Sequence, residues 1–316
     1  MPPPAFDGTE RPEAPSGVVL ARGAFTEFLA MTLFVFFGCG AAASNAKKDE
    51  SRFDRFDSGS STGEAAEWDP AATSSIALQF GLGITVLAYF SAHSSGGHIN
   101  CAVTWALVIV GKCHPIQGLV YLVAQLLGSI TGALFLKGCT RGAEGDGSVI
   151  DRTGGLGANG FQNDSVTTGG AFVAEMMGTM LLVLVVLETA VNGNALTTEG
   201  NKPVAGNKLN LAPIPIGLAV FLAHMVLIPI TGCSINPTRS FGPSLVAGSW
   251  DHHWIWWIAP LLGATVGAMV WGVMMALAIE DANAPAAKPK QDKEDLGSEL
   301  TVVDEDDDDD DEAAED

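Results

Sequence analysis

Cysteine and basic side chains are scarce in this sequence. Its five cysteines are odd in number and lie mostly in or beside apolar stretches, so we expect no disulfide framework. Only 16 lysine and arginine residues stand against 36 acidic residues, and for a chain of net charge −20 we expect no nucleic-acid partner. The first 22 residues contain charges and prolines but no apolar core, so no cleavable signal peptide is expected there.

The body of the chain is nearly neutral in net charge. Residues 280–316 hold 17 acidic residues against three lysines, which accounts for −14 of the net charge. The run at 304–312 is a like-charge block, typical of a solvated and disordered segment. With 47% apolar residues and 37 glycines, the chain is too hydrophobic and too rich in glycine for an ordinary soluble domain. The composition therefore indicates a membrane protein with an acidic tail.

Six apolar stretches are long enough to cross a bilayer, which requires roughly 20 residues. They cover residues 24–43, 75–91, 115–136, 172–190, 211–230 and 253–279. Side chains in them that can titrate near neutral pH include Glu27, Glu175, Glu188 and His224. We expect the first of these stretches to direct insertion into the membrane.

Two polar segments recur at matched places between the apolar stretches, SGGHINCA at 95–102 and TGCSINPT at 231–238. Nineteen residues before the asparagine of each segment stands a glycine followed by leucine, at Gly81 and Gly217. Further glycines lie 28 and 32 residues after the first asparagine, and 27 and 31 residues after the second. Each half also has a lone glutamate near its start. These matches indicate an internal duplication.

An apolar piece of about ten residues follows each asparagine, at 100–110 and 236–247. At 1.5 Å per residue, each reaches only about half of the roughly 30 Å hydrocarbon thickness. Asparagine is a preferred helix N-cap, and Pro237 is suited to the first helical position. The pieces predict re-entrant half-helices. Amphipathic surface loops are the alternative, which fits poorly with the apolar run 106–110.

Each half therefore has three full spans and one half-span. An odd number of crossings places the two halves in the membrane upside down relative to each other, so the half-helices enter from opposite faces. Asn100 and Asn236 then meet near the midplane, where two positive helix ends converge. This arrangement repels cations and orients small dipoles. The predicted fold is an all-α membrane bundle of six spans, two re-entrant half-helices and an inverted internal repeat.

The boxes around the two asparagines resemble those of the aquaporins, the major intrinsic protein channels, over essentially residues 22–280. The carriers of the resemblance are SGGHINCAV at 95–103 and TGCSINPTRSFGP at 231–243, and LAPIPIG at 211–217 is most similar to plant plasma-membrane members. The resemblance implies a right-handed helix bundle, one pore per subunit and a homotetramer. It also implies a multi-pass protein of the plasma membrane with both termini cytoplasmic.

Two residues depart from the pattern of the family. Cys101 stands where the first box normally has proline, and Thr238 stands where the second box usually has alanine. Losing proline at the first helical position removes a conformational constraint, but cysteine is small and adopts helical angles. We expect Asn100 to stay in place with a slightly looser turn.

The resemblance also implies a four-residue selectivity filter, placed by distance from the two asparagines. Twenty residues before Asn100 is Phe80, and twelve before, three before and three after Asn236 are His224, Cys233 and Arg239. This set resembles that of strict water channels. Members that conduct glycerol typically have a small residue at the histidine position and an acid directly after the arginine, where this chain has His224 and Ser240.

Backbone carbonyls of the two boxes are expected to line the pore, at Gly96, Gly97, His98, Gly232, Cys233 and Ser234. The symmetric acids Glu27 and Glu175 invite a proton-relay role. Their placement and the family's use of them favour instead a structural role in bracing the re-entrant loops, with His98 helping in the first loop.

Three domains are expected. They are an N-terminal cytoplasmic tail at 1–22, a channel domain at 23–280, and an acidic disordered cytoplasmic tail at 281–316. Within the channel domain, the first repeat covers about 23–140 and the second about 170–280. The long loop at 192–210 is placed to cap the inner mouth, as its counterpart does in plant plasma-membrane members.

The resulting expectation is a passive water channel that excludes protons and ions, not an enzyme, with no metal or other cofactor. The alternative is a broader pore that passes glycerol, urea or other small neutral solutes. A proton-coupled transporter and a junctional protein on the same scaffold also remain open, as do carbon dioxide, ammonia and peroxide as further permeants.

Overall fold

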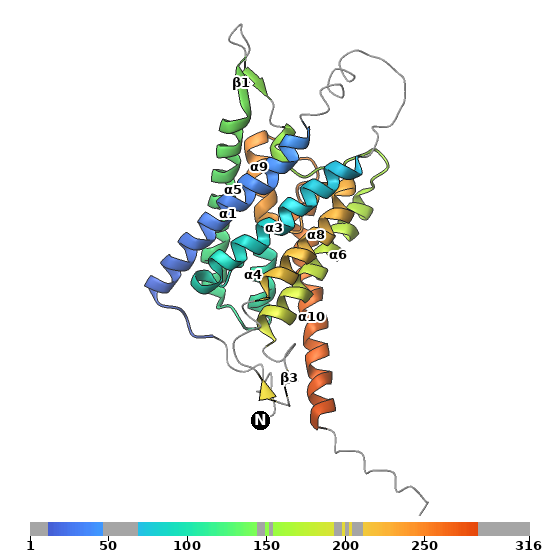
Figure 1. Ribbon diagram of the computed structural model, residues 1–316. Coiled ribbons are helices and arrows are strands. Elements are labelled where there is room, and N and C mark those ends of the chain that lie inside the picture. Colours follow the sequence, from blue (N-terminus) through green and yellow to red (C-terminus); the bar gives the residue numbers. More distant parts are fainter. Residues whose placement is uncertain are drawn as a thin grey trace, which may run out of the picture.

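The computed structural model describes residues 12–46, 69–143, 149–151, 154–192, 198–199, 202–203 and 211–283, and their fold is almost entirely helical (Figure 1). The α-helices are α1 Gly17–Ala46, α3 Pro70–Ser95, α4 Cys101–Ile109, α5 Pro115–Thr140, α6 Thr168–Val186, α8 Pro213–Thr231, α9 Pro237–Ala247 and α10 Ile255–Asn283. The connections contain the short elements β1 Arg141–Ala143, β2 Val149–Asp151, η2 Gly154–Gly157, η3 Leu187–Val191, β3 Thr198–Glu199 and β4 Lys202–Pro203. The strands form two antiparallel pairs, β1 with β2 and β3 with β4.

The six predicted spans are confirmed as helices. Among the described residues, α1, α3, α5, α6, α8 and α10 are long and apolar enough to cross a membrane. Their outer faces keep large apolar side chains uncovered, such as Val86 at 63%, Leu119 at 62% and Met269 at 64% exposure, as suits contact with lipid. Two helices are longer than predicted, since α1 already begins at Gly17 and α10 continues to Asn283.

Side chains and prolines fix where several helices begin. The Asp69 carboxylate accepts hydrogen bonds from the amides of Ala71 and Ala72, and Pro70 takes the first helical position of α3. Thr167 caps α6 by accepting from the Gly170 amide at 3.1 Å. These local signals place the two helices in register with the rest of each half.

The two halves of the chain pack in the same way. In the first half, α1 lies along α3 and α5; in the second, α6 lies along α8 and α10, while α3 and α8 join the halves. Each half-helix is held mainly by the opposite half, because α4 packs on α10 and α9 packs on α5. In Figure 1, α4 lies in the lower part of the bundle and α9 in the upper part. The inverted repeat is thus visible in the helix contacts.

Matched glycines allow the closest helix approaches. A Cβ atom on Gly81 would lie 2.8 Å from the carbonyl oxygen of Gly217, and one on Gly217 would lie 2.5 Å from that of Gly81. Similarly, a Cβ on Gly128 would lie 2.4 Å from the Phe28 oxygen, and one on Gly263 2.2 Å from the Met176 oxygen. Backbones approach closely at these sites because a side chain is missing.

Both re-entrant loops follow the same unusual backbone path. The helix before each loop ends at a glycine with positive φ, 91° at Gly96 and 73° at Gly232. The residue before each asparagine is an isoleucine with positive φ, 48° at Ile99 and 42° at Ile235. A β-branched residue rarely adopts this conformation, so the surrounding contacts must hold the two loops in place.

Three of the sequence expectations fall partly or mostly outside the described residues. They concern the N-terminal tail at 1–22, the acidic tail at 281–316, and the loop at 192–210 that is expected to cap the inner mouth. The described parts of these segments are 12–22, 281–283, and residues 192, 198–199 and 202–203 of the loop.

Candidate functional site

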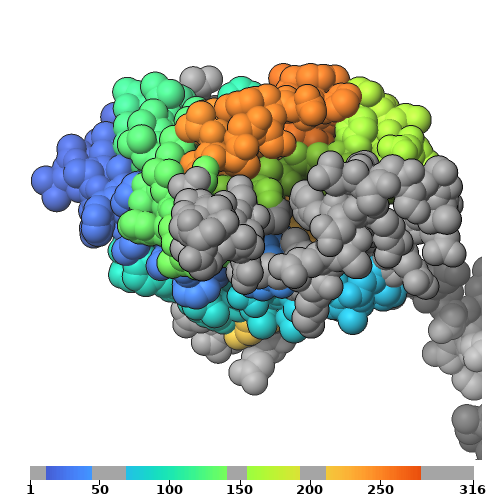
Figure 2. All heavy atoms as spheres, turned by 90° about the horizontal axis from the view of Figure 1, so that it is seen from above, coloured from blue at the N-terminus to red at the C-terminus, as the bar shows by residue number. Residues whose placement is uncertain are grey.

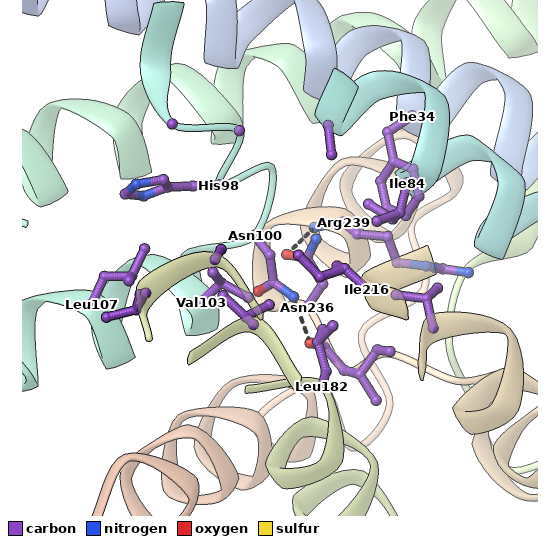
Figure 3. Close-up of a pocket in the computed structure, with 18 of the residues that line it drawn as sticks. Phe34, Ile84, His98, Asn100, Val103, Leu107, Leu182, Ile216, Asn236 and Arg239 are labelled. Atoms are coloured by element: carbon purple, nitrogen blue, oxygen red, sulfur yellow. Dashed lines mark hydrogen bonds between the residues drawn. The ribbon is translucent and has the colours of Figure 1, made fainter. Parts of the chain in front are cut away.

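A cavity of about 320 Å³ lies between the two halves (Figure 3). One end is lined by Lys112, which follows α4, by Val191 at the end of η3, and by Ile216 near the start of α8. Its other end is lined by His224 and Arg239. Most of the remaining wall is apolar, and the polar groups are concentrated on the two re-entrant loops. The cavity therefore presents a few fixed polar groups within an apolar tube.

The two asparagines meet in the middle of this cavity (Figure 3). The Asn100 side-chain nitrogen donates to the carbonyl of Ile235 at 2.9 Å, and the Asn236 nitrogen donates to the carbonyl of Ile99 at 2.8 Å. Each side-chain oxygen caps its own half-helix, Asn100 by accepting from the Ala102 amide at 2.8 Å and Asn236 by accepting from its own helix amide three residues on. Because a carboxamide nitrogen carries two protons, each asparagine keeps one for the cavity.

Glu27 of α1 holds the first re-entrant loop. One carboxylate oxygen accepts from the His98 amide at 2.9 Å and the Ser95 hydroxyl at 2.6 Å. The other accepts from the Ile99 amide at 2.7 Å and from the Gln125 side chain at 2.8 Å. Glu27 is fully buried, and these donors account for its acceptor capacity. Because the loop amides point toward Glu27, the loop carbonyls are free to face the cavity.

Glu175 of α6 holds the second loop through equivalent contacts. It accepts from the amides of Ser234 at 2.8 Å and Ile235 at 2.7 Å, and from the Thr231 hydroxyl. Glu175 is likewise fully buried. Both carboxylates are thus occupied by loop donors, a geometry that supports bracing more than proton relay.

Three of the four predicted filter residues come together. The rings of Phe80 and His224 stack with centroids 4.3 Å apart, and the Arg239 guanidinium carbon lies 4.9 Å from the centre of the Phe80 ring. His224 and Arg239 line the cavity, whereas Phe80 supports them from behind. Cys233 is fully buried and does not reach the cavity wall.

The guanidinium of Arg239 is fixed by a loop that sequence reasoning missed. One of its terminal nitrogens donates to the carbonyl of Gly157 at 2.8 Å and to the side-chain oxygen of Asn159 at 2.9 Å. The same Asn159 oxygen accepts from the Ser240 hydroxyl at 2.7 Å, and its nitrogen donates to the Thr231 carbonyl at 3.2 Å. Arg239 is only 2% exposed, so this support replaces water around a buried cation.

The hydrogen bond of His224 defines its tautomer. Its Nδ1 lies 2.8 Å from the carbonyl of Val220, which can only accept, so Nδ1 carries the proton of the neutral ring. The Nε2 atom is then an acceptor, and it has no hydrogen-bond partner among the described residues. The filter end of the cavity thus offers donors from Arg239 and one acceptor from His224.

The predicted carbonyl line is only partly on the cavity wall. Gly96, Gly97, His98 and Ser234 line it, whereas Gly232 and Cys233 do not. The His98 ring turns toward Thr104, with Nδ1 3.0 Å from the threonine hydroxyl. Its ring therefore braces the loop that its backbone belongs to.

The end of the molecule nearest Arg239 is formed by the second half-helix and its surroundings. Viewed from above, the connection between α9 and α10 (orange) lies between α5 (green) and the start of α6 (yellow-green) (Figure 2). Packing of α9 on α5 and of α10 on α6 agrees with this view. A six-span bundle with two half-helices that point their capped ends into one narrow cavity is the architecture of a membrane channel.

Known proteins place this channel in a family. The profile of the major intrinsic proteins matches residues 16–271. Aquaporin-2 of Rattus norvegicus is 34% identical over 278 residues, which is 87% of this chain and 84% of that protein. Aquaporin PIP2-1 of Arabidopsis thaliana is 41% identical over 196 residues, 61% of this chain and 63% of that protein. This chain belongs to the major intrinsic protein family of aquaporin channels and is not an enzyme.

A solved structure shows the same fold. The aquaglyceroporin from Plasmodium falciparum superposes with a TM-score of 0.64 and 23% sequence identity, covering 83% of this chain and 99% of that one. At this identity the likeness concerns the fold. The protein is thus a multi-pass membrane channel for water or another small solute.

Proposed function

We propose that this protein is a passive channel selective for water, which excludes glycerol, protons and ions. The observation that carries the proposal is the filter end of the cavity, where His224 and Arg239 share one narrow passage against the Phe80 ring. A stacked imidazole and a guanidinium leave room for few atoms beside them. Glycerol would have to lose several hydrogen bonds with water and regain them from one acceptor and a few donors.

Water passage follows from the order of polar groups along the cavity. Carbonyls of Gly96 and Gly97 accept hydrogen bonds from passing molecules, and the apolar wall opposite offers none. At the centre, the second amide protons of Asn100 and Asn236 donate to the oxygen of one water molecule. That water then has no acceptor site left along the pore axis, so it donates its own protons to its two neighbours and can accept a hydrogen bond from neither of them.

Proton and cation exclusion follows from the same geometry. At the two asparagines the direction of hydrogen bonding along the single file of water molecules reverses, so a proton cannot be relayed through the file. The N-termini of α4 and α9 converge there with their positive dipole ends, and Arg239 adds a full positive charge at the filter. A hydrated cation meets repulsion at both places, and its hydration shell cannot fit.

We place both termini on the cytoplasmic side of the plasma membrane and four copies in the assembly. Six crossings return the chain to the side on which it started. The similarity in sequence to plant plasma-membrane members supports the plasma membrane as the location. The exposed apolar side chains on the outer helix faces, such as Leu119 and Met269, provide surface both for lipid and for neighbouring subunits.

Stopped-flow light scattering on reconstituted vesicles tests the function. Water and glycerol gradients are applied in parallel to vesicles with the protein and to empty vesicles. We expect fast water flux with a low activation energy and glycerol flux near that of empty vesicles. Equal and fast glycerol flux would establish the broader pore instead, and solute accumulation against a gradient would establish a transporter.

A further inference from the structure

Glu188 is a second glutamate of the fourth span, thirteen residues after the one that braces the re-entrant loop. One oxygen of its carboxylate accepts a hydrogen bond from the Asn192 side chain at 2.9 Å, and the other accepts from the Trp271 indole at 3.2 Å. Trp271 belongs to α10 and is only 3% exposed. The carboxylate therefore links the end of the fourth span to the last helix. We call these three side chains the Glu188 bridge.

The fourth span changes its helix type at this carboxylate. Helix α6 ends at Val186, and η3, from Leu187 to Val191, is a single π-helical turn. The Asn192 amide closes this turn by donating to the Leu187 carbonyl at 2.9 Å, five residues back. Such turns are rare, and they occur frequently at functional sites. The Glu188 bridge contacts this turn near its start and directly after its end.

The π-helical turn decides which side chains reach the cavity. Residues of this span that line the cavity are Leu182, Val186, Ala190 and Val191. In a regular α-helix, Val191 would lie about 140° around the axis from Val186 and point away from the cavity, whereas Thr189 would lie only about 60° from it. The wider turn brings Val191 round to the side of Val186 and leaves Thr189 off the cavity wall. The wall at the end opposite the filter thus depends on the turn.

The matched positions of the first half carry neither the bridge nor the turn. In place of Glu188, thirteen residues after the bracing glutamate, stands Gly40; in place of Trp271, eight residues after the matched glycine, stands Leu136. These two positions also face each other, because a Cβ atom on Gly40 would lie 3.5 Å from a methyl carbon of Leu136. Helix α1 continues past this point as an α-helix to Ala46. The bridge and the π-helical turn therefore occur together, in one half only.

We propose that Glu188 is a positioning residue of the pore, whose carboxylate, hydrogen-bonded to Asn192 and Trp271, holds the π-helical turn that directs Val191 toward the permeant. Glu188 itself does not line the cavity. The inference goes beyond the proposed selectivity, because it concerns the end of the cavity opposite the filter and requires only that the channel conducts a permeant.

Two cysteine substitutions test which side chain faces the pore, Val191→Cys and Thr189→Cys. Each variant is treated with methanethiosulfonate ethylammonium, and its water flux in vesicles is measured. Val191→Cys places a thiol on the cavity wall, so we expect treatment to block its water flux. Thr189→Cys lies off the wall and should keep its flux. Wild type treated in the same way shows the contribution of the native cysteines.

Removing the carboxylate should exchange the two positions. In the Glu188→Ala background the turn relaxes toward α-helical geometry. The rate of block should then fall about tenfold or more in Val191→Cys, the size of effect given by the loss of one hydrogen bond to a charged group. In Thr189→Cys the rate of block should rise. A pattern of block that does not change with Glu188→Ala would overturn the proposal.

Glu188→Gln is the conservative variant. Its amide oxygen accepts from the Trp271 indole, and its nitrogen donates to the Asn192 carboxamide oxygen once that group turns over. We therefore expect Glu188→Gln to keep the pattern of block seen with the native glutamate. If it shows the pattern of Glu188→Ala, hydrogen bonds do not hold the turn and the proposal is wrong.

Trp271→Phe tests the link to α10 in a double-mutant cycle. It keeps most of the ring and removes the indole N–H. We expect it to slow the block of Val191→Cys less than Glu188→Ala does, and to change nothing further in the Glu188→Ala background. Effects that multiply would overturn the link. A lower melting temperature with an unchanged pattern of block would reduce the bridge to a merely structural role, against the proposal.

Failure of the proposed function looks different. If wild-type vesicles conduct glycerol as fast as water, the selectivity proposal fails, while block of the glycerol flux still decides the role of Glu188. If wild type is selective for water and the pattern of block does not depend on Glu188, only this inference is wrong.

Discussion

The two ends of the pore occupy equivalent places in the repeat but differ in chemistry. Counting from the asparagines, the filter positions have counterparts in the other half at Ile216, Ala88, Gly97 and Val103, and all four line the cavity. We call these four residues the apolar end. At these matched positions one end of the pore thus carries an imidazole and a guanidinium, and the other carries small or aliphatic groups, although Lys112 also lines the cavity at that end.

This difference distinguishes the residues that hold the half-helices in place from those assigned to selectivity. Features shared by both halves, such as the glutamate braces and the crossed asparagine bonds, hold the half-helices in place. Features found in one half, such as His224 and Arg239, are the ones to which the proposed function assigns contact with the permeant. An inverted repeat therefore supplies a symmetric frame, and the proposed selectivity depends on side chains at one end of it.

The largest expected effect comes from removing a shared feature. Glu175→Ala leaves the loop amides of Ser234 and Ile235 without acceptors, which should cost about 3 kcal/mol or more of unfolding free energy. Glu27→Ala should cost a similar amount, because its contacts match. Thermal and denaturant unfolding in detergent measures both losses, with exposed Glu13→Ala as the control. A loss in only one of the two variants would contradict the shared frame.

The second largest effect is expected from a variant in which the filter end is changed to match the apolar end. In the double variant His224→Ala, Arg239→Val, each residue takes the identity of its counterpart. We expect the ratio of glycerol to water permeability to rise at least about tenfold, as a pocket loses its power to reject larger solutes. Vesicle swelling assays give the ratio.

A matched control for that variant lies at the other end. Val103→Ala enlarges the apolar end without touching the filter and should leave the permeability ratio unchanged. If the control raises glycerol permeability as much as the double variant does, selection is not located at the filter end.

The smallest expected effect is a pH dependence of stability that arises from His253, in the connection between α9 and α10. His253 Nε2 accepts from the Trp257 indole at 3.2 Å, and partial burial lowers the pKa of His253 below its usual value. The unfolded chain therefore takes up this proton at a higher pH, so the stabilisation is complete above about pH 6.5 and is lost as pH falls toward the folded pKa.

The variant His253→Phe removes this titration. We expect its melting temperature to fall less than that of wild type between neutral pH and pH 5.5, measured by intrinsic fluorescence. The exposed His93→Gln is the control and should keep the wild-type slope. An unchanged slope in His253→Phe would show that acid acts elsewhere.

Much of the fold was predictable because it depends on local signals. Length and apolarity indicated the six spans, and the cap chemistry of asparagine followed by Pro237 indicated where a half-helix starts. The resemblance to the aquaporins, applied at set distances from the asparagines, also identified His224 and Arg239. Helix ends were less predictable, as at Gly17 and Asn283, because a helix continues after its hydrophobic stretch ends.

Contacts between distant segments were not predictable. Asn159 and the Gly157 carbonyl reach Arg239 only because η2 folds back onto α1, and no pattern in its glycine-rich sequence indicates that partner. Burial of Cys233 behind the cavity wall also depends on the strained loop, where its φ is 54°. The apolar end went unnoticed because aliphatic residues in an apolar chain carry no signal of their own.

The crossed asparagine bonds bear on how the protein is made. The carbonyl of Ile99 accepts a hydrogen bond from Asn236, which is made 137 residues later in the chain, and Asn100 donates to the carbonyl of Ile235. Neither bond can form before the second loop has been synthesised. During synthesis, the first re-entrant loop therefore enters the membrane with polar groups that its own half cannot satisfy. The nascent first half needs water or the insertion machinery as a temporary hydrogen-bond partner. The centre of the pore is complete only when the last third of the chain has been inserted.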